Sequence, residues 1–299
     1  MLEVCLLGCG GMLPLPARHL TALTVRLNGR RLLIDCGEGT QVALRENGIG
    51  FKAIDMILLT HLHTDHTAGL PGLLLTVGNA GRTEPLTVWG PPGTAEVIEG
   101  VKRIAQEIPF PIRVTEKTDP LPFAGAQLTP FPCFHRIPCR GYAIELPRRG
   151  VFRAEAARAL NIPLPLWHTL QSGEAVTFDG RTVTPEEVLG PERKGLKLCY
   201  CTDTRPAKAI GEAVRGADLL IAEGMYTAPE DEESAAEKRH MTMREAALLA
   251  KNAGVAALWF THYSPKLVSP VVIPQEVLSV FPGAEAGFDG KSVCLRFKE

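Results

Sequence analysis

The chain has 299 residues, of which 45% are hydrophobic, and it carries 32 lysines and arginines against 33 aspartates and glutamates. This globular balance excludes a disordered chain, and a net charge of −1 excludes a generally basic nucleic-acid coat. No apolar run approaches the roughly 18 residues that a membrane helix needs.

Strands and helices alternate along the first part of the chain. In order, we predict strands over Glu3–Gly8, Thr21–Leu27 and Arg31–Ile34, a helix over Glu38–Asn47, a buried strand over Ile54–Thr60, a helix over Gly69–Val77, a strand over Leu86–Trp89 and a helix over Thr94–Gln106. Three antiparallel strands follow, over Ile112–Glu116, Ala126–Phe134 and Arg140–Leu146.

The segment Pro147–Gly195 is rich in Arg, Pro and Gly, and we predict that it is an arm inserted into the domain, with one short helix over Ala154–Leu160. Beyond the arm we predict strands over Leu196–Cys201, Ala217–Ala222 and Ala256–Thr261, and a capping box from Thr242 to Glu245 that opens a helix ending near Asn252. This alternation predicts an α/β fold with layered sheets, in one domain over residues 1–299 with 147–195 as its arm.

The N-terminus and the cysteines bear on localisation. The N-terminal apolar stretch is short and lacks a charged leader, so it predicts a first strand rather than a signal peptide. None of the eight cysteines forms a Cys-x-x-Cys motif. In a chain of this length the pattern indicates reduced thiols and a cytoplasmic protein.

The strongest chemical signal is the hexapeptide His61-Leu-His63-Thr-Asp65-His66, which directly follows a predicted buried strand. Residues two apart in an extended chain point the same way, so His61 and His63 can hold one ion. Asp65 and His66 begin the next turn and can face a neighbouring position. Because imidazole and carboxylate are ligands of zinc and similar divalent ions, the hexapeptide predicts a metal site.

Three further donors, His135, Asp203 and His262, each end an apolar run, and ligands of α/β sheets gather at strand ends. We expect His61, His63 and His135 to hold one ion, Asp65, His66 and His262 to hold a second, and Asp203 to bridge the two. The expected cofactors are two zinc ions per chain, with manganese or iron as alternatives. Such a pair can bind a hydroxide and assist displacement at a phosphate.

Three other residues are softer candidates. Asp35 ends a predicted strand and can orient a ligating imidazole from outside the metal shell, cap the helix that follows, or do both. Either Glu223 or His240 can protonate a leaving oxygen, although spacing alone favours the alternative of a surface glutamate and a histidine at a helix start. We treat His19 and His168 as structural.

These motifs resemble the metallo-β-lactamase fold and, more closely, ribonuclease Z. The stretches that carry the closer resemblance are Asp35-Cys-Gly-Glu-Gly-Thr-Gln41, Thr60-His-Leu-His-Thr-Asp-His66, Gly69-Leu-Pro-Gly72, Pro85-Leu-Thr-Val-Trp-Gly-Pro91, Gly141-Tyr142, Val188-Leu-Gly-Pro191, Thr202-Asp-Thr-Arg205 and Thr261-His-Tyr-Ser264. They occur in order over nearly the whole chain.

The resemblance implies an αββα sandwich and a zinc-dependent phosphodiesterase that cuts precursor tRNA endonucleolytically at its 3′ side with a metal-bound hydroxide. It implies a homodimer whose arm grips the tRNA of the neighbouring active site. It also implies that Glu223 and His240 help to protonate the leaving 3′-oxygen, and that Asp65 belongs to the catalytic residues as well as to the ligands.

The arm leaves a second enzymatic reading open. It carries seven basic residues (Arg148, Arg149, Arg153, Arg158, Arg181, Arg193 and Lys194) against six acidic ones (Glu155, Glu174, Asp179, Glu186, Glu187 and Glu192). RNA affinity depends on phosphate contacts by Lys and Arg, so a nearly neutral arm favours a hydrolase of a small phosphodiester, such as a cyclic nucleotide, or of another ester. A metal-holding scaffold without activity is the third reading.

Overall fold

The structure is a computed structural model that describes residues 1–227 and 229–298, and it divides into two compact units. The larger unit comprises Met1–Glu145 and Lys197–Arg296. The smaller comprises Leu146–Leu196 with the chain end from Phe297.

The larger unit is built on two mixed sheets, each of seven strands within the described residues. The first has the order β16 (Ser292–Leu295), β1 (Leu2–Gly8), β2 (Ala22–Leu27), β3 (Arg30–Ile34), β4 (Ile54–Leu58), β5 (Leu86–Trp89) and β6 (Ile112–Thr115). The second has the order β15 (Ala284–Ala286), β14 (Leu258–Thr261), β13 (Leu219–Glu223), β12 (Arg193–Cys201), β9 (Cys139–Arg148), β8 (Ala126–Cys133) and β7 (Leu121–Phe123).

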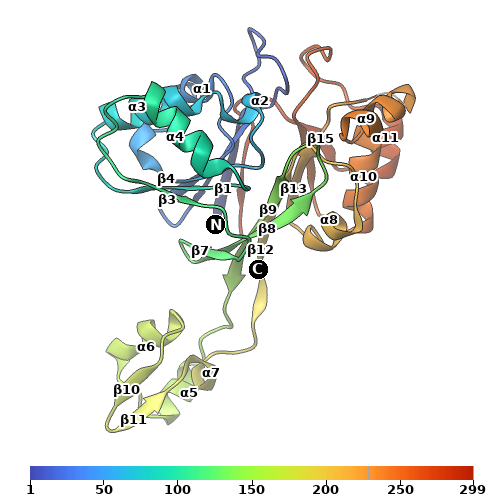
Figure 1. Cartoon of the computed structure of the whole chain (residues 1–299). Helices are drawn as coiled ribbons and strands as arrows, with labels where there is room; N and C mark the ends of the chain where they lie inside the picture. Colours follow the sequence, from blue (N-terminus) through green and yellow to red (C-terminus); the bar gives the residue numbers. More distant parts are fainter. Residues whose placement is uncertain (228, 299) are drawn as a thin grey trace. The chain divides into compact units, whose positions relative to one another are not determined.

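Helices cover the outer face of each sheet (Figure 1). The helices beside the first sheet are α1 (Thr40–Glu46), α2 (Thr64–Thr67), α3 (Leu70–Asn79) and α4 (Thr94–Ile104), and those beside the second are α8 (Lys208–Ala213), α9 (Glu232–Lys238), α10 (Met243–Asn252) and α11 (Gln275–Val280). Short 3₁₀ turns lie at Phe51–Ala53 and Pro229–Asp231. Separate apolar cores, one containing Leu73 and Ile98 and the other Ala246 and Phe260, seal the two helix layers onto their sheets.

Two buried aromatic side chains connect the sheets. The hydroxyl of Tyr142, on β9, donates hydrogen bonds to the carbonyl oxygens of Leu59 (2.7 Å) and Trp89 (3.2 Å). The rings of Trp89 and Tyr142 meet edge-on, with their centroids 5.5 Å apart. These contacts fix the end of β4, where the hexapeptide begins, against the second sheet.

The strand Ile112–Glu116 was expected to pair antiparallel, and this prediction is wrong. It forms β6, which runs parallel to β5 at the edge of the first sheet. Helix α4 lies between the two strands, and a helical crossover returns the chain in the same direction.

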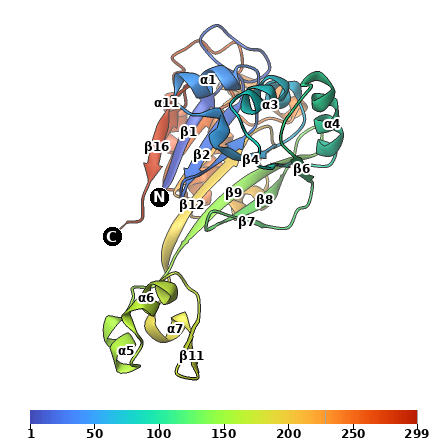
Figure 2. The same ribbon diagram turned by 90° about the vertical axis from the view of Figure 1, so that its left-hand side faces the viewer.

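The smaller unit contains more structure than the single helix expected there. Besides α5 (Ala154–Ala159) it has α6 (Leu164–Gln171), α7 (Pro185–Val188) and a hairpin of β10 (Val176–Phe178) and β11 (Arg181–Val183) (Figure 1). Figure 2 shows α5, α6, α7 and β11 from another side. A small core containing Leu170 and Val183 holds these elements together. Each segment is too short for its apolar period to stand out in the sequence, which is why the prediction missed them.

We expect Tyr142→Phe to destabilise the protein by about 1–3 kcal/mol, because the buried carbonyl oxygens of Leu59 and Trp89 lose their shared donor. The matched control is Tyr200→Phe, since the buried Tyr200 hydroxyl makes no hydrogen bond within the described residues. Urea unfolding should show a loss for the first variant and none for the second. Equal losses for both would show that the two hydrogen bonds of Tyr142 contribute nothing specific.

Candidate metal centre and active site

The predicted donors come from loops at one edge of the two sheets. His61 and His63 follow β4, Asp65 and His66 lie on α2, and His135 follows β8. Asp203 and His262 follow β12 and β14, which run parallel to β13 between them, so their carboxyl ends meet at one edge. Asp203 (φ 51°) and His262 (φ 55°) both adopt the left-handed conformation, which non-glycine residues rarely take and which is common at functional sites.

Two glycines hold α2 in place. The backbone N–H of Cys36 donates to the carbonyl oxygen of His66 (2.8 Å), and that of Gly69 donates to the carbonyl oxygen of Cys36 (2.9 Å). A Cβ atom on Gly69 would lie 2.3 Å from the carbonyl oxygen of Gly37, and one on Gly37 would lie 2.4 Å from that of Asp65. Only glycine permits this approach, which presses the hexapeptide against the loop after β3.

The first group of ligating atoms is made of three imidazoles. His61 Nε2 lies 3.1 Å from His63 Nδ1, which lies 3.2 Å from His135 Nε2. These three atoms lie within 4.8 Å of one another. Burial is the main cause that lowers the pKa of each imidazole, that of His135 to about 4. The rings are therefore neutral near pH 7, which is the form that binds a metal.

The second group joins two imidazoles and a carboxylate. His66 Nε2 lies 3.2 Å from His262 Nε2, and Asp65 Oδ2 lies 3.3 Å from His262 Nε2 and 3.7 Å from His66 Nε2. The same Asp65 oxygen accepts a hydrogen bond from the backbone N–H of Met12 at 2.7 Å. Burial raises the pKa of Asp65, but the hydrogen bond from His262 and the charges of both histidines outweigh it and bring the pKa below its ordinary value.

Asp203 lies between the two groups. Its Oδ2 is 3.2 Å from His262 Nε2 and 3.3 Å from His66 Nε2, while its Oδ1 is 3.9 Å from His61 Nε2. The residue is buried, and its Oδ2 accepts no hydrogen bond from any described residue. Burial alone raises the pKa of this carboxyl, but the surrounding imidazoles hold it well below its ordinary value, so the group is an anion.

Asp35 contacts His66 and does not cap a helix. Its Oδ2 is 2.8 Å from His66 Nδ1, and its Oδ1 accepts the backbone N–H of Thr60 at 2.8 Å. The N-cap of α1 is Gly39, so the helix-capping alternative is wrong. Burial lowers the pKa of His66, but the charges of Asp35 and Asp203 outweigh this effect and raise it well above its ordinary value.

Glu223 and His240 form a pair beside Asp203. His240 Nδ1 is 2.8 Å from Glu223 Oε2, and the other oxygen of Glu223 accepts the backbone N–H of Thr204 at 2.7 Å. His240 Nδ1 lies 3.7 Å from Asp203 Oδ1. Both residues are buried, so the alternative of a surface glutamate is wrong. Burial lowers the pKa of His240, but Glu223 more than compensates and raises it.

Several residues that support the site lie within the family motifs, but no role was predicted for them from the sequence. Thr60 and Thr204 act through backbone N–H groups, and Arg205 donates to the carbonyl oxygen of His240 (2.6 Å) while it pairs with Glu245. Such contacts depend on how loops pack, which no spacing rule gives. His19 pairs with Glu46 at 3.1 Å, away from the cluster.

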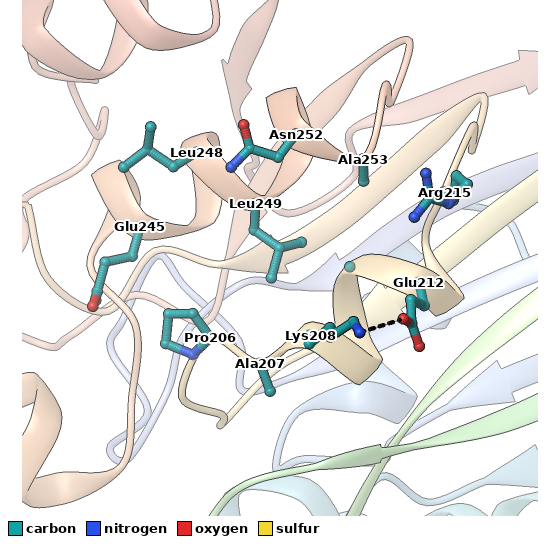
Figure 3. Close-up of a pocket in the computed structure, with 11 residues that line it drawn as sticks. Pro206, Ala207, Lys208, Glu212, Arg215, Glu245, Leu248, Leu249, Asn252 and Ala253 are labelled. Carbon is teal, nitrogen blue, oxygen red and sulfur yellow. Dashed lines mark ion pairs between the residues drawn. The ribbon is translucent and has the colours of Figure 1, made fainter.

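A separate cavity of about 540 Å³ lies between α8 and α10 (Figure 3). Pro206, Leu248 and Leu249 line it, and Lys208 pairs with Glu212 at 3.7 Å beside it. Its lining includes no histidine, so it offers none of the chemistry found at the cluster.

Two family models match parts of the chain. The model described as a beta-lactamase superfamily domain matches residues 146–263, and the model of the anti-Pycsar protein Apyc1 matches residues 2–90. Among curated relatives, ribonuclease Z of Lachnoclostridium phytofermentans is 51% identical over 99% of both chains, and that of Agathobacter rectalis is 50% identical over 100% of both. The chain belongs to the ribonuclease Z family. The family inferred from the motifs is therefore confirmed.

Solved structures agree on the fold of this ribonuclease Z family member. The short form of human tRNase Z covers 99% of this chain and 100% of its own, with a TM-score of 0.70 and 23% identity. The metallo-beta-lactamase fold protein YhfI from Bacillus subtilis has a TM-score of 0.71 and 20% identity, with 98% of both chains covered. The predicted fold class is confirmed, and so is the expectation of an enzyme of the metal-dependent hydrolase class. Every helix of the described residues is too short or too polar to cross a membrane.

We expect Glu223→Gln to lower the pKa of His240. The variant removes the carboxylate that raises this pKa and leaves the burial that lowers it. NMR titration of the ring protons in metal-free protein measures this directly. A pKa that is raised in the folded protein stabilises the fold at pH values below the pKa of the unfolded chain, about 6.5. The stabilisation is lost as the pH rises through the pKa of the folded state. The wild type should therefore exceed the variant in stability by more at about pH 6 than at about pH 9. A pKa that does not fall would show that Glu223 does not set the charge of His240.

Proposed function

We propose that this chain is a zinc-dependent endoribonuclease that cuts precursor tRNA at its 3′ side. One observation carries the proposal: seven donor groups and a carboxylate–imidazole pair meet at one buried edge, in a chain half identical to ribonuclease Z proteins. Ribonuclease is the activity in the relatives' name, and the position of the cut comes from the family resemblance.

The donor set fits two divalent cations. Ring nitrogens of His61, His63 and His135 face one another, and the lowered pKa values leave the rings neutral, so each ring has one nitrogen lone pair available for a cation. The Oδ2 of Asp203 is buried with no hydrogen-bond donor among the described residues, which suits an oxygen ligand. Zinc is the cation we propose, since imidazole and carboxylate are its ligands.

The allocation of ligands follows the two groups. His61, His63 and His135 would hold one ion, Asp65, His66 and His262 the other, and Asp203 would touch both. Asp35 would fix the ring of His66 through Nδ1. When bound, such a pair of ions lowers the pKa of a water molecule and stabilises the charge of a phosphate in displacement.

The remaining residues handle protons. Glu223 holds Nδ1 of His240 and raises its pKa, so the imidazole retains a proton near neutral pH. A leaving 3′-oxygen needs such a donor, and we propose that His240 supplies the proton with Glu223 as its partner. Asp65 is ionised, and its carboxylate can accept a hydrogen bond from the attacking water in addition to its role as a ligand.

We propose that the smaller unit is the tRNA-gripping arm. Its arginines already contact its own groups: Arg153 donates to the carbonyl oxygen of Glu187, Arg181 pairs with the carboxylate of Glu187 at 2.7 Å, and Arg158 lies over the ring of Trp167. This internal use, with the near-neutral charge of the arm, favours the second candidate, a hydrolase of small phosphodiesters. Family membership favours precursor tRNA, which stays our first choice.

Two further proposals concern the state of the protein in the cell. A homodimer follows from the family resemblance alone, and light scattering at micromolar concentration would read it directly. A cytoplasmic location is supported by the cysteines, all eight of which are free thiols.

We expect Asp203→Ala to weaken zinc binding at both positions, because a bridging carboxylate serves both ions. Metal analysis after dialysis should find about two ions per wild-type chain and fewer than one per variant chain. Asp55→Ala is the matched control, since Asp55 pairs with Arg30 at 3.2 Å and touches none of the ligands. A variant that keeps one ion fully bound would show that Asp203 is no bridge.

Replacing Arg153–Val188 with a short turn should abolish precursor-tRNA cleavage and leave hydrolysis of bis-nitrophenyl phosphate intact. The backbone N–H of Gly190 donates to the carbonyl oxygen of Val151 at 2.8 Å, so the two ends are already paired and the turn closes them without strain. The affinity for tRNA should also depend less on salt. For every phosphate that the arm no longer neutralises, the negative slope of log affinity against log salt concentration should become shallower by about 0.9. If the intact chain binds tRNA weakly and the deletion changes little, the small-substrate candidate is correct. Equal loss of both activities would contradict both candidates.

A further inference from the structure

The chain makes a strained turn immediately before His240. Helix α9 ends at Lys238, and Arg239 follows it in the left-handed conformation, with φ of 60°. The backbone N–H of Arg239 donates to the carbonyl oxygen of Ala236 (3.2 Å), and that of His240 donates to the carbonyl oxygen of Ala235 (2.8 Å). This pair of bonds is a Schellman motif, in which glycine normally occupies the left-handed position.

An arginine in place of glycine is strained there, and its side chain makes an interaction that can offset this strain. Its guanidinium Nη1 donates to the carbonyl oxygen of His135 at 2.7 Å. Residues 135 and 239 are far apart in the chain, and this bond ties the end of α9 to the loop after β8.

Arg239 also contacts the ring of His135. Its carbonyl oxygen lies 3.2 Å from His135 Nδ1. A carbonyl oxygen only accepts, so Nδ1 must carry the ring proton. That leaves Nε2 without a proton, and it is Nε2 that faces His63 Nδ1 at 3.2 Å. Arg239 therefore holds both the backbone and the ring of the same residue.

We propose that Arg239 is a positioning residue for His135, which fixes its tautomer and aims its Nε2 at the first metal position while its turn delivers His240 to Glu223. The inference rests on the proposed metal site. Arg136 closes the contact from the other side, because its Nη2 donates to the carbonyl oxygen of Glu237 at 3.3 Å. Arg136, next to His135, thus holds the end of α9, and Arg239, just after α9, holds His135.

The variant that tests this proposal is Arg239→Gly. Glycine keeps the carbonyl oxygen and relaxes the left-handed turn, but it removes the guanidinium. Titration of zinc against a chromophoric chelator should show one of the two ions bound about 10–100-fold more weakly, as for other residues that orient a ligand, and the other ion unchanged. The Tm of the metal-free protein should stay the same or rise. Arg239→Ala should weaken the same ion but lower the Tm, because it keeps the strained turn and loses the guanidinium contact that offsets the strain in the wild type.

Lys238→Ala is the control, because Lys238 is an adjacent exposed cation that lies over the ring of Tyr226 and touches no ligand. It should leave both zinc affinities unchanged. Unchanged zinc affinities in Arg239→Gly, or equal weakening of both ions together with a lower Tm, would overturn the proposal, since the first denies any effect and the second indicates a merely structural role.

A second measurement does not depend on metal. In metal-free wild-type protein, long-range ¹H–¹⁵N spectra should show His135 as the Nδ1-protonated tautomer, and Arg239→Gly should keep this tautomer, because glycine retains the carbonyl oxygen that accepts from Nδ1. A mixture already present in the wild type would overturn the positioning role. Wild-type protein that shows the single tautomer but binds fewer than two zinc ions would instead contradict the proposed metal site.

Discussion

The carboxylate of Asp203 is the group on which the site depends. It is buried among imidazoles from both sheets, and each of its oxygens faces a different group of donors. A buried anion without cationic partners would be too costly to keep, and imidazoles at this density without an anion would repel any added positive charge. The Asp203 carboxylate and the imidazoles around it therefore stabilise one another, and the packing of one sheet against the other brings them together. Tyr142 contributes to that packing from the interior.

The sequence predicts those site residues whose positions follow from local backbone geometry. His61, His63, Asp65 and His66 lie within six residues, and the periods of strand and turn fix their directions. Asp203 and His262 could be added because parallel strands end at one edge, a rule that needs only the strands to be recognised. His135 was found in the same way, although its strand β8 runs antiparallel to β9. The αββα fold itself came from the family resemblance rather than from the alternation of elements.

What could not be predicted depends on tertiary contacts. The sequence left two roles open for Asp35, a helix cap and a support for a ligating imidazole, and the packing of the loop after β3 against α2 decides for His66. Glu223 and His240 were candidates with no predicted contact, and the structure brings His240 Nδ1 to 2.8 Å from Glu223 Oε2. Arg239, in the left-handed turn after α9, contradicts the local preference for glycine, and such contradictions are expected at functional sites. The helices of the arm were missed because each segment is too short to show a periodic pattern of apolar residues.

The hydrogen bond between Val151 and Gly190 has a consequence for how this protein diversifies. A segment whose two ends already touch can be lengthened, shortened or exchanged at almost no cost in loop closure, since the closing contact is independent of what it encloses. Natural variation can therefore accumulate between those two residues while the donor groups at the sheet edge are inherited unchanged. The segment between Val151 and Gly190 can therefore be exchanged for another one, and such an exchange can direct the same reaction to a different class of substrate.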